Sequence, residues 1–312
     1  MKHIILIILT SLTLNVSCQQ LISKNSSLLT VNTKLGYIVY FKALSTEPDE
    51  YKEGNIYIYD VNKKVSSLLN SNVYILEYLK VDWTANGDIF FISTGDSLVS
   101  FSLNNKEKRN VYKTHNDGVI NNFSISVNGK IIVVNEKIFS TVSSKQISYL
   151  ITNESTEPVM IYKIDDPSEG EMLKNELLVG TFGNKVFIRN INNELFEYDI
   201  EKLSLNKIDS NVIKAYCVSE ENIYYTKQNS LIQFNTNTNT YFDILEGEKL
   251  NIYYIGSYMD KLAICLNDNM FLYEKGIGLK RINNLKKGKY IYLDEEYAIE
   301  DLDNSLYIHI PQ

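Results

Sequence analysis

One short pattern recurs along this chain of 312 residues: two apolar residues, a variable residue and then an aromatic one. The clearest copy is Asn55-Ile56-Tyr57-Ile58-Tyr59-Asp60. The final position of the pattern falls on Tyr59, Phe101, Tyr162, Tyr198, Phe234, Tyr273 and His309. The steps between these positions are 42, 61, 36, 36, 39 and 36 residues. A strand-like unit repeated at such an interval indicates an array of small structural repeats.

Each copy is accompanied by further strand signals. A second apolar run lies about nine residues upstream, as at Ile89–Ile92, a third lies before it, as at Leu177–Phe182, and runs such as Lys64–Leu69 follow downstream. Turn signals such as Asn128-Gly129 separate these runs. Four strands per repeat predict an all-β fold, a β-propeller of seven four-stranded blades. Six blades and an irregular unit are the alternative, because the third copy is the least regular.

The two ends of the chain are expected to complete the ring together. Only Pro311 and Gln312 follow the last copy, so the last blade ends at its third strand. A segment before the first blade, roughly Gln20 to Lys24, is predicted to supply the missing outer strand. Pairing of the N- and C-terminal segments would remove the exposed edges that a gap leaves. We therefore expect one propeller domain over residues 18–312.

The first 17 residues are not predicted to belong to that domain. A short basic start precedes an apolar run, Ile4–Leu14, which is too short to span a bilayer, and Ser17-Cys18 follows. This arrangement resembles a bacterial lipoprotein signal, although Asn15 stands where that pattern usually has leucine. The resemblance implies cleavage before Cys18, lipid attachment to Cys18, and export to the cell envelope as a membrane-anchored protein. Ordinary signal cleavage just after Cys18, which would give a secreted or periplasmic protein, is the alternative.

Two stretches resemble the repeats of TolB-like or WD40-like propellers. Val81–Ile89 and Phe123–Ile131 each give a strand, an Asn-Gly turn and a second strand, but both lack the proline of that family's turn. The resemblance implies the propeller fold and carries no active site.

Charge and cysteine content narrow the functional classes. The net charge is −7 and there are only three arginines, with no basic stripe, which argues against binding nucleic acid. Cys217 and Cys265 lie in apolar strand-like runs and are predicted to be buried free thiols, with a disulfide as the alternative. We expect no metal and no cofactor.

The sequence offers few candidates for catalysis. His309 occupies an aromatic position of the repeat and is predicted to pack as an aromatic does. His115 is predicted to be an exposed loop residue, and the acidic clusters, such as Asp294-Glu295-Glu296, to be solvated. No His-x-x-x-His, Cys-x-x-Cys or Gly-x-Ser-x-Gly arrangement occurs. No acidic residue, histidine or arginine recurs at the same position of successive repeats, and this absence favours a binding function over a catalytic one.

The third repeat is the candidate binding region. Asn135–Pro158 lengthens it by roughly 20 residues, and long loops on rigid scaffolds often carry specificity. The predicted partner contacts are Phe139, Tyr149, Leu150 and Ile151; an extra hairpin of the blade is the alternative. The leading hypothesis is a non-enzymatic binding module or scaffold that recognises a protein, peptide or glycan. A glycoside hydrolase or polysaccharide lyase using carboxylates from several blades, and a purely structural envelope subunit, are the other hypotheses.

Overall fold

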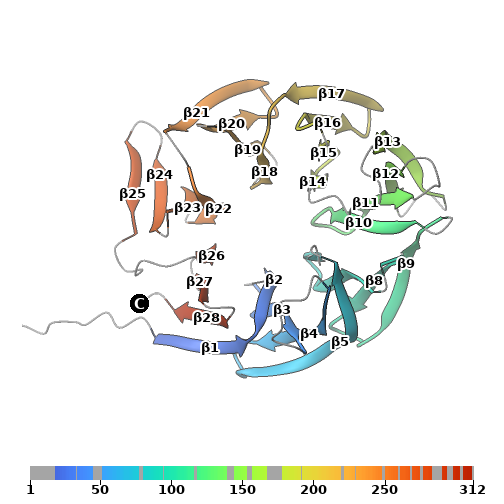
Figure 1. Cartoon of the computed structure of the whole chain (residues 1–312), viewed down its shortest axis with the longest axis vertical. Helices are drawn as coiled ribbons and strands as arrows, with labels where there is room; N and C mark the ends of the chain where they lie inside the picture. Colours follow the sequence, from blue (N-terminus) through green and yellow to red (C-terminus); the bar gives the residue numbers. More distant parts are fainter. Residues whose placement is uncertain are drawn as a thin grey trace, which may run out of the picture.

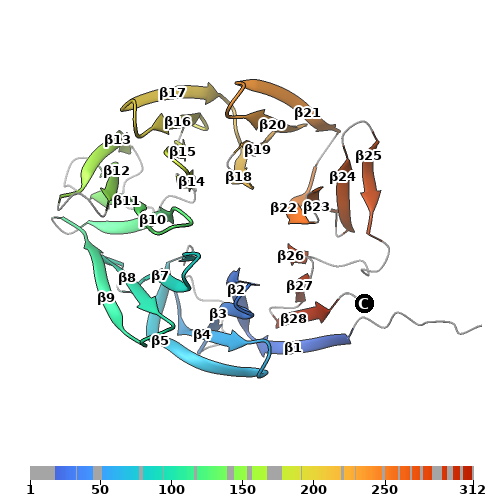
Figure 2. The same cartoon turned by 180° about the vertical axis from the view of Figure 1, so that it is seen from behind.

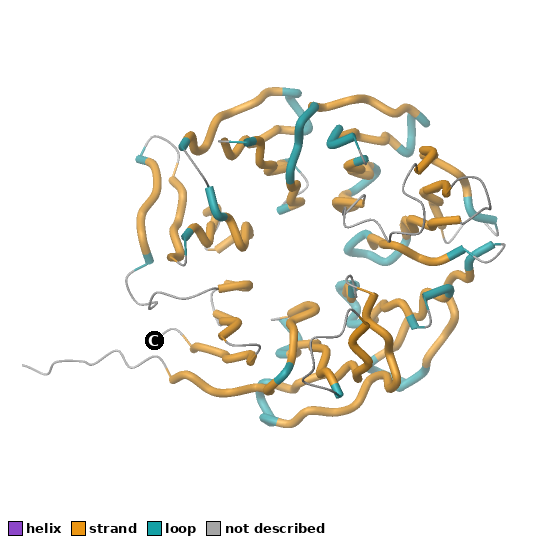
Figure 3. The backbone as a smooth tube through the Cα atoms, in the orientation of Figure 1, coloured by secondary structure: helices purple, strands orange, loops and turns teal. Residues whose placement is uncertain are grey.

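The computed structural model describes residues 18–310 except for short interior segments. Those segments are 33, 45–50, 77–79, 94, 116–117, 139–143, 153–156, 167–177, 191, 219–220, 229, 248–249, 259–260, 268, 275–276, 283–289, 294–297 and 303–304. The described residues form strands, turns and loops, with no helix among them (Figure 3). Within this part of the chain, therefore, no helical segment has the length and apolar character of a membrane span.

Seven four-stranded antiparallel sheets follow one another around a ring, as the repeat predicts (Figures 1 and 2). Blade 1 consists of β2 (Ser26–Asn32), β3 (Tyr37–Ala43), β4 (Tyr51–Asp60) and β5 (Val65–Leu76). Blade 2 consists of β6 (Val81–Trp83), β7 (Asp88–Ile92), β8 (Ser97–Ser102) and β9 (Lys108–Lys113). Blade 3 consists of β10 (Val119–Ile125), β11 (Ile131–Ile138), β12 (Ser144–Thr152) and β13 (Val159–Asp166).

The remaining blades repeat this order from the centre of the ring outward. Blade 4 consists of β14 (Leu178–Phe182), β15 (Lys185–Arg189), β16 (Leu195–Asp199) and β17 (Ser204–Asp209). Blade 5 consists of β18 (Lys214–Cys217), β19 (Asn222–Lys227), β20 (Ser230–Asn235) and β21 (Thr240–Glu246). Blade 6 consists of β22 (Ile252–Tyr258), β23 (Lys261–Leu266), β24 (Asn269–Glu274) and β25 (Gly278–Arg281). Blade 7 consists of β26 (Tyr290–Leu293), β27 (Ala298–Leu302), β28 (Ser305–Ile310) and β1 (Cys18–Lys24).

Blade 7 confirms the predicted closure of the ring. β1 pairs antiparallel with β28, with Cys18 opposite Ile310 and Lys24 opposite Ser305. The Gln20 amide also donates a 2.8 Å hydrogen bond to the Tyr59 hydroxyl of blade 1. β1 thus covers the exposed edge of β28 in blade 7 and also contacts blade 1. The N-terminal strand and the C-terminal strand together close the ring.

The hydrophobic core lies between blades. Ile56 of blade 1, for example, packs in one buried cluster with Ile89 and Phe91 of blade 2. In the second strands, such as β7, four consecutive residues are buried. Since neighbouring blades cover both faces of such a strand, its sequence is a continuous apolar run rather than an alternating one.

The third repeat is built differently from the prediction. Tyr162 belongs to β13, the outermost strand of blade 3, whereas the other repeated positions fall in third strands. The third strand of blade 3 is β12, which pairs with β11 from Lys145 to Thr152. Much of Asn135–Pro158 is therefore the regular β11–β12 hairpin of the blade, and the predicted insertion at this place was wrong.

The turns explain part of the abundance of asparagine. Six of the nine non-glycine residues with positive φ among the described residues are asparagines, including Asn193 and Asn239. Asparagine tolerates this conformation because its short side chain can bond locally.

Because successive strands alternate in direction, the turns divide between the two faces of the ring. We call first face the one that carries the turns between first and second strands and between third and fourth strands. The second face carries the other connections, including those between blades.

Candidate functional site

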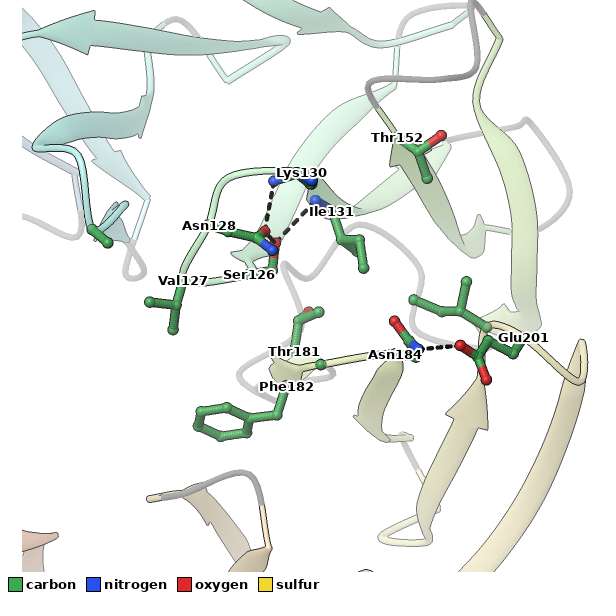
Figure 4. A pocket seen from close by; sticks show the side chains of 13 residues that line it. Ser126, Val127, Asn128, Lys130, Ile131, Thr152, Thr181, Phe182, Asn184 and Glu201 are labelled. Atoms are coloured by element: carbon green, nitrogen blue, oxygen red, sulfur yellow. Dashed lines mark hydrogen bonds between the residues drawn. The ribbon is translucent and has the colours of Figure 1, made fainter.

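A cleft of about 840 Å³ opens on the first face between blades 3 and 4 (Figure 4). Its walls come from the β10–β11 turn, the β14–β15 turn and the β16–β17 turn, with Thr152 at the end of β12. Ala85 of blade 2 also reaches its edge. These segments are far apart in the sequence, and only the packing of blades brings them together.

The β10–β11 turn forms a rigid wall of the cleft. The Asn128 side-chain oxygen accepts hydrogen bonds from the Ser126 hydroxyl at 2.8 Å and from the Lys130 backbone N–H at 3.0 Å. The Ser126 hydroxyl oxygen in turn accepts from the Ile131 N–H at 3.0 Å. Gly129 has a φ of 72°, which glycine adopts without strain. The Asn-Gly signal of the sequence thus predicts this turn, and the asparagine side chain fixes it.

The opposite wall joins two turns of blade 4. The backbone turns at Gly183, and the Asn184 side-chain amide donates to a Glu201 carboxylate oxygen of the β16–β17 turn (Figure 4). The Ile200 N–H donates to the Asn184 carbonyl at 2.8 Å. These bonds join the two turns of blade 4 into one wall of the cleft.

Thr181 is the most informative residue of the cleft. Its side chain is 4% exposed, and its hydroxyl has no hydrogen-bond partner among the described residues. Figure 4 shows this hydroxyl directed toward the side of Ser126 and Ile131, while the Phe182 ring projects the opposite way. A buried hydroxyl without a partner costs folding free energy, so its presence in a cleft indicates a place where a ligand atom can bind.

The cleft is poor in ionisable groups. Lys130 and Glu201 are the only ones among its described lining residues, and they belong to walls of different blades. A pair of carboxylates, or a histidine beside a nucleophile, is what acid–base or covalent catalysis requires. The rest of the lining combines hydroxyl and amide groups with apolar side chains, and both suit an uncharged ligand; the apolar ones are Ala85, Val127, Ile131, Phe182 and Ile200.

A second polar constellation lies on the second face, where blades 2 and 3 meet. The carboxylate of Glu136 is completely buried and accepts a 2.5 Å hydrogen bond from the Tyr112 hydroxyl and a 3.1 Å bond from the His115 backbone N–H. His115 Nδ1 lies 3.7 Å from Glu136, and the His115 ring contacts the Tyr149 ring, with 5.6 Å between their centres. Burial, and then the hydrogen bond to Glu136, raise the pKa of Tyr112 far above its usual value.

This constellation refines the prediction for His115. The side chain is about half exposed, as expected for a loop residue, but it is held beside a buried carboxylate. Sequence reasoning missed Glu136, because the adjacent pair Glu136-Lys137 near the end of Ile131–Ile138 gives no sign of which groups each side chain contacts.

The predicted partner contacts of blade 3 take different positions. Leu150 is 5% exposed and packs in the core between blades 3 and 4, a position that argues against the predicted contact with a partner. Tyr149 and Ile151 are partly buried against the cluster between blades 2 and 3, and a contact through them stays a prediction. Phe139 lies outside the described residues.

His309 and Cys265 are buried, as predicted, whereas Cys217 is only partly buried. His309 is 3% exposed and packs in blade 7, where its Nε2 lies 2.8 Å from the Glu300 carboxylate. Cys217 and Cys265 form no disulfide within the described part of the chain. Burial raises the pKa of the Cys217 thiol, which makes it a poor nucleophile. In the described part of the chain, no group of three histidine, cysteine or acidic side chains gathers as metal ligands.

Comparisons with known proteins support the fold alone. No family model matches the sequence, and no curated protein matches it either. Among solved structures, an oligogalacturonate lyase in complex with manganese is 9% identical with a TM-score of 0.68, over 94% of this chain and 93% of that one. The Cps50 (Swd1) β-propeller domain of Myceliophteria thermophila is 13% identical with a TM-score of 0.60, over 93% of this chain and 97% of that one. An acylaminoacyl peptidase of Pyrococcus horikoshii is 13% identical with a TM-score of 0.58, over 88% of this chain and 48% of that one. The same fold thus occurs in enzymes and in a β-propeller domain of another protein, and the chain itself is a seven-bladed β-propeller.

Proposed function

We propose that this protein is a non-enzymatic binding module of the bacterial cell envelope, which recognises its partner in the cleft between blades 3 and 4. The observation that carries the proposal is the buried Thr181 hydroxyl, which has no hydrogen-bond partner among the described residues and faces the cleft. A ligand that donates to or accepts from this hydroxyl would recover the energy that burial costs. The rigid walls reduce the ordering that binding requires.

The lining chemistry favours binding over catalysis at this cleft. The described residues place one lysine and one glutamate there, on separate walls. A hydrolase or lyase needs converging acid and base groups. The likeness to oligogalacturonate lyase concerns the fold, and at 9% identity it transfers no residue roles to this chain.

A membrane anchor at Cys18 is part of the same proposal. Cys18 is the first residue of β1 and pairs with Ile310, so a lipid on Cys18 would have no linker between it and the ring. The anchored protein would then lie directly at the membrane surface.

The test is ligand binding by a soluble form, residues 18–312 with Cys18→Ser, measured by calorimetry. Thr181→Val removes the hydroxyl and nearly conserves the shape of the side chain. We expect it to weaken binding about tenfold or more, because a hydrogen bond to a buried partner is lost. Ser210→Ala, on the second face at the end of blade 4, is the control and should bind as the parent does. Equal affinity of Thr181→Val and the parent would refute this site, and turnover of a polysaccharide by the parent would favour the lyase hypothesis.

A further inference from the structure

A second cleft, of about 500 Å³, lies on the first face between blades 4 and 5. Its walls come from the other side of the β16–β17 turn, where Asp199 and Lys202 line it, and from the β20–β21 turn around Thr236 and Asn237. Tyr241 of β21 also lines it.

The two clefts share blade 4 as their common wall. Glu201 lines the first cleft and Lys202 lines the second, and these residues are neighbours in one turn. In the same way, Asn184 lines the first cleft and Lys185 the second. Since consecutive Cα atoms are about 3.8 Å apart, only the β14–β15 and β16–β17 turns of blade 4 separate the two clefts at these residues.

The lysines of the second cleft are neutralised by nearby carboxylates. Lys185 Nζ lies 3.1 Å from Glu197 and donates to the Thr236 carbonyl at 3.0 Å. Lys202 Nζ lies 2.7 Å from Asp199, and Lys207 pairs with Glu194. The cleft therefore offers little net positive charge to attract an acidic polymer.

The polar side chains of the second cleft are suited to an uncharged polar ligand. Asn206, Asn237 and Asn239 present amides that both donate and accept hydrogen bonds. Tyr241 adds an aromatic ring that is about half exposed. Its hydroxyl donates to the Ile208 carbonyl at 2.9 Å and its ring packs on Phe234, with 5.0 Å between the centres, so the ring is held in place.

We propose that the two clefts form one groove that binds a linear, uncharged oligosaccharide laid across blade 4. A sugar unit presents hydroxyls, which match amides and the Thr181 hydroxyl, and a C–H face, which packs on an aromatic ring such as Tyr241. A peptide requires apolar pockets for its side chains, and the second cleft is lined mostly by polar groups. This inference rests on the proposed function and adds to it the ligand class and the second half of the site.

The experiment measures binding of the soluble 18–312 Cys18→Ser form to defined probes by calorimetry. The probes are the hexamers of glucose (β-1,4 and α-1,4), xylose and N-acetylglucosamine, with the matching dimers. Hexagalacturonate tests an acidic polymer, and an uncharged hexapeptide of alanine and serine tests a peptide. We expect an uncharged hexamer to bind at least tenfold more tightly than its dimer, because only the hexamer can reach both clefts.

Tyr241→Ala tests the second cleft. It should lower the affinity for the hexamer to about that for the dimer and leave the dimer unchanged. The matched control is Phe242→Ala, since Phe242 is an exposed aromatic residue on the same strand that lines neither cleft. The control should bind as the parent does.

The outcomes separate this inference from the proposed function. Equal affinity for hexamer and dimer, with no effect of Tyr241→Ala, overturns the two-cleft groove; a loss with Thr181→Val would still support the first cleft. Binding of hexagalacturonate or the hexapeptide, but of no uncharged sugar, overturns the ligand class. A hexamer that binds without any effect of Thr181→Val or Tyr241→Ala overturns both proposals.

Discussion

Replacing Thr181 by valine should make the free protein more stable while it weakens ligand binding. The Thr181 hydroxyl is buried and has no hydrogen-bond partner among the described residues. A buried polar group left without a partner costs about 1–3 kcal/mol, and valine removes that cost and nearly conserves the shape. Valine also suits the strand conformation of β14. Thr181→Val should therefore raise the stability of the free protein and lower its affinity for the ligand. A residue that serves only the fold would not give these two opposite changes.

The expected size follows from the length of the chain. A melting entropy of about 2.1 cal/mol/K per residue gives roughly 0.6 kcal/mol/K for about 295 residues, so a gain of about 1 kcal/mol raises Tm by roughly 1.6 °C. Differential scanning calorimetry of the soluble form resolves such a shift, and urea unfolding gives the same free-energy change from the midpoint.

Thr226→Val is the matched control. Thr226 is another buried strand threonine, but its hydroxyl oxygen accepts a 3.2 Å hydrogen bond from the Lys214 N–H. The same substitution there leaves a backbone donor without its partner and should lower the stability by about 1 kcal/mol. If Thr181→Val lowers Tm as much as Thr226→Val does, the Thr181 hydroxyl has a partner in the folded protein and our reasoning about the cleft is wrong.

Three further predictions address other parts of the molecule. Gly118→Ala should destabilise the protein by about 1–3 kcal/mol in urea unfolding, because the added Cβ would lie 2.3 Å from the Glu136 carboxylate, whereas Gly247→Ala, with its nearest neighbour at 3.7 Å, should change little. Burial alone would raise the pKa of Asp209, but hydrogen bonds from Lys227, Tyr225 and the Ser210 N–H together hold this pKa below its usual value. The ionised Asp209 carboxylate therefore stabilises the fold above a pH of about 4, and this stabilisation is lost as the pH falls through the lowered pKa. Between about pH 4 and pH 2, the Tm of Asp209→Asn should therefore fall less than the Tm of the parent. An equal fall of Tm in both proteins would show that the ion pair between Asp209 and Lys227 does not contribute to the pH dependence of stability. Cys18→Ser in the full chain should move the protein from the membrane fraction to the soluble fraction of the envelope, and unchanged detergent-dependent fractionation would exclude a lipid on Cys18.

The sequence predicted the architecture well because a blade is mainly a local structure. Strand runs, Asn-Gly turns and their spacing are properties of neighbouring residues, so the repeat gave seven blades and the place of most strands. Closure by β1 was predictable because a last blade with three strands leaves an edge that needs a partner.

The third blade marks the limit of this reasoning. Val159–Tyr162 satisfies the apolar–aromatic pattern, yet it forms an outermost strand, since an exposed edge strand and a third strand can share one local pattern. Pairing with β11 and β13 identifies β12 as the third strand, and pairing is a property of the assembled sheet.

By itself, then, the sequence determined the propeller architecture, the turn chemistry and the closure of the ring and favoured seven blades over six, because these depend on short-range patterns and on spacing. Only the tertiary structure decided which turns meet across blades 3, 4 and 5 and which polar groups become buried there. Thr181 and Glu136 look ordinary in the sequence, because burial and hydrogen bonding come from neighbours on other strands and other blades. The candidate site arises from that long-range packing, which no local pattern in this chain records.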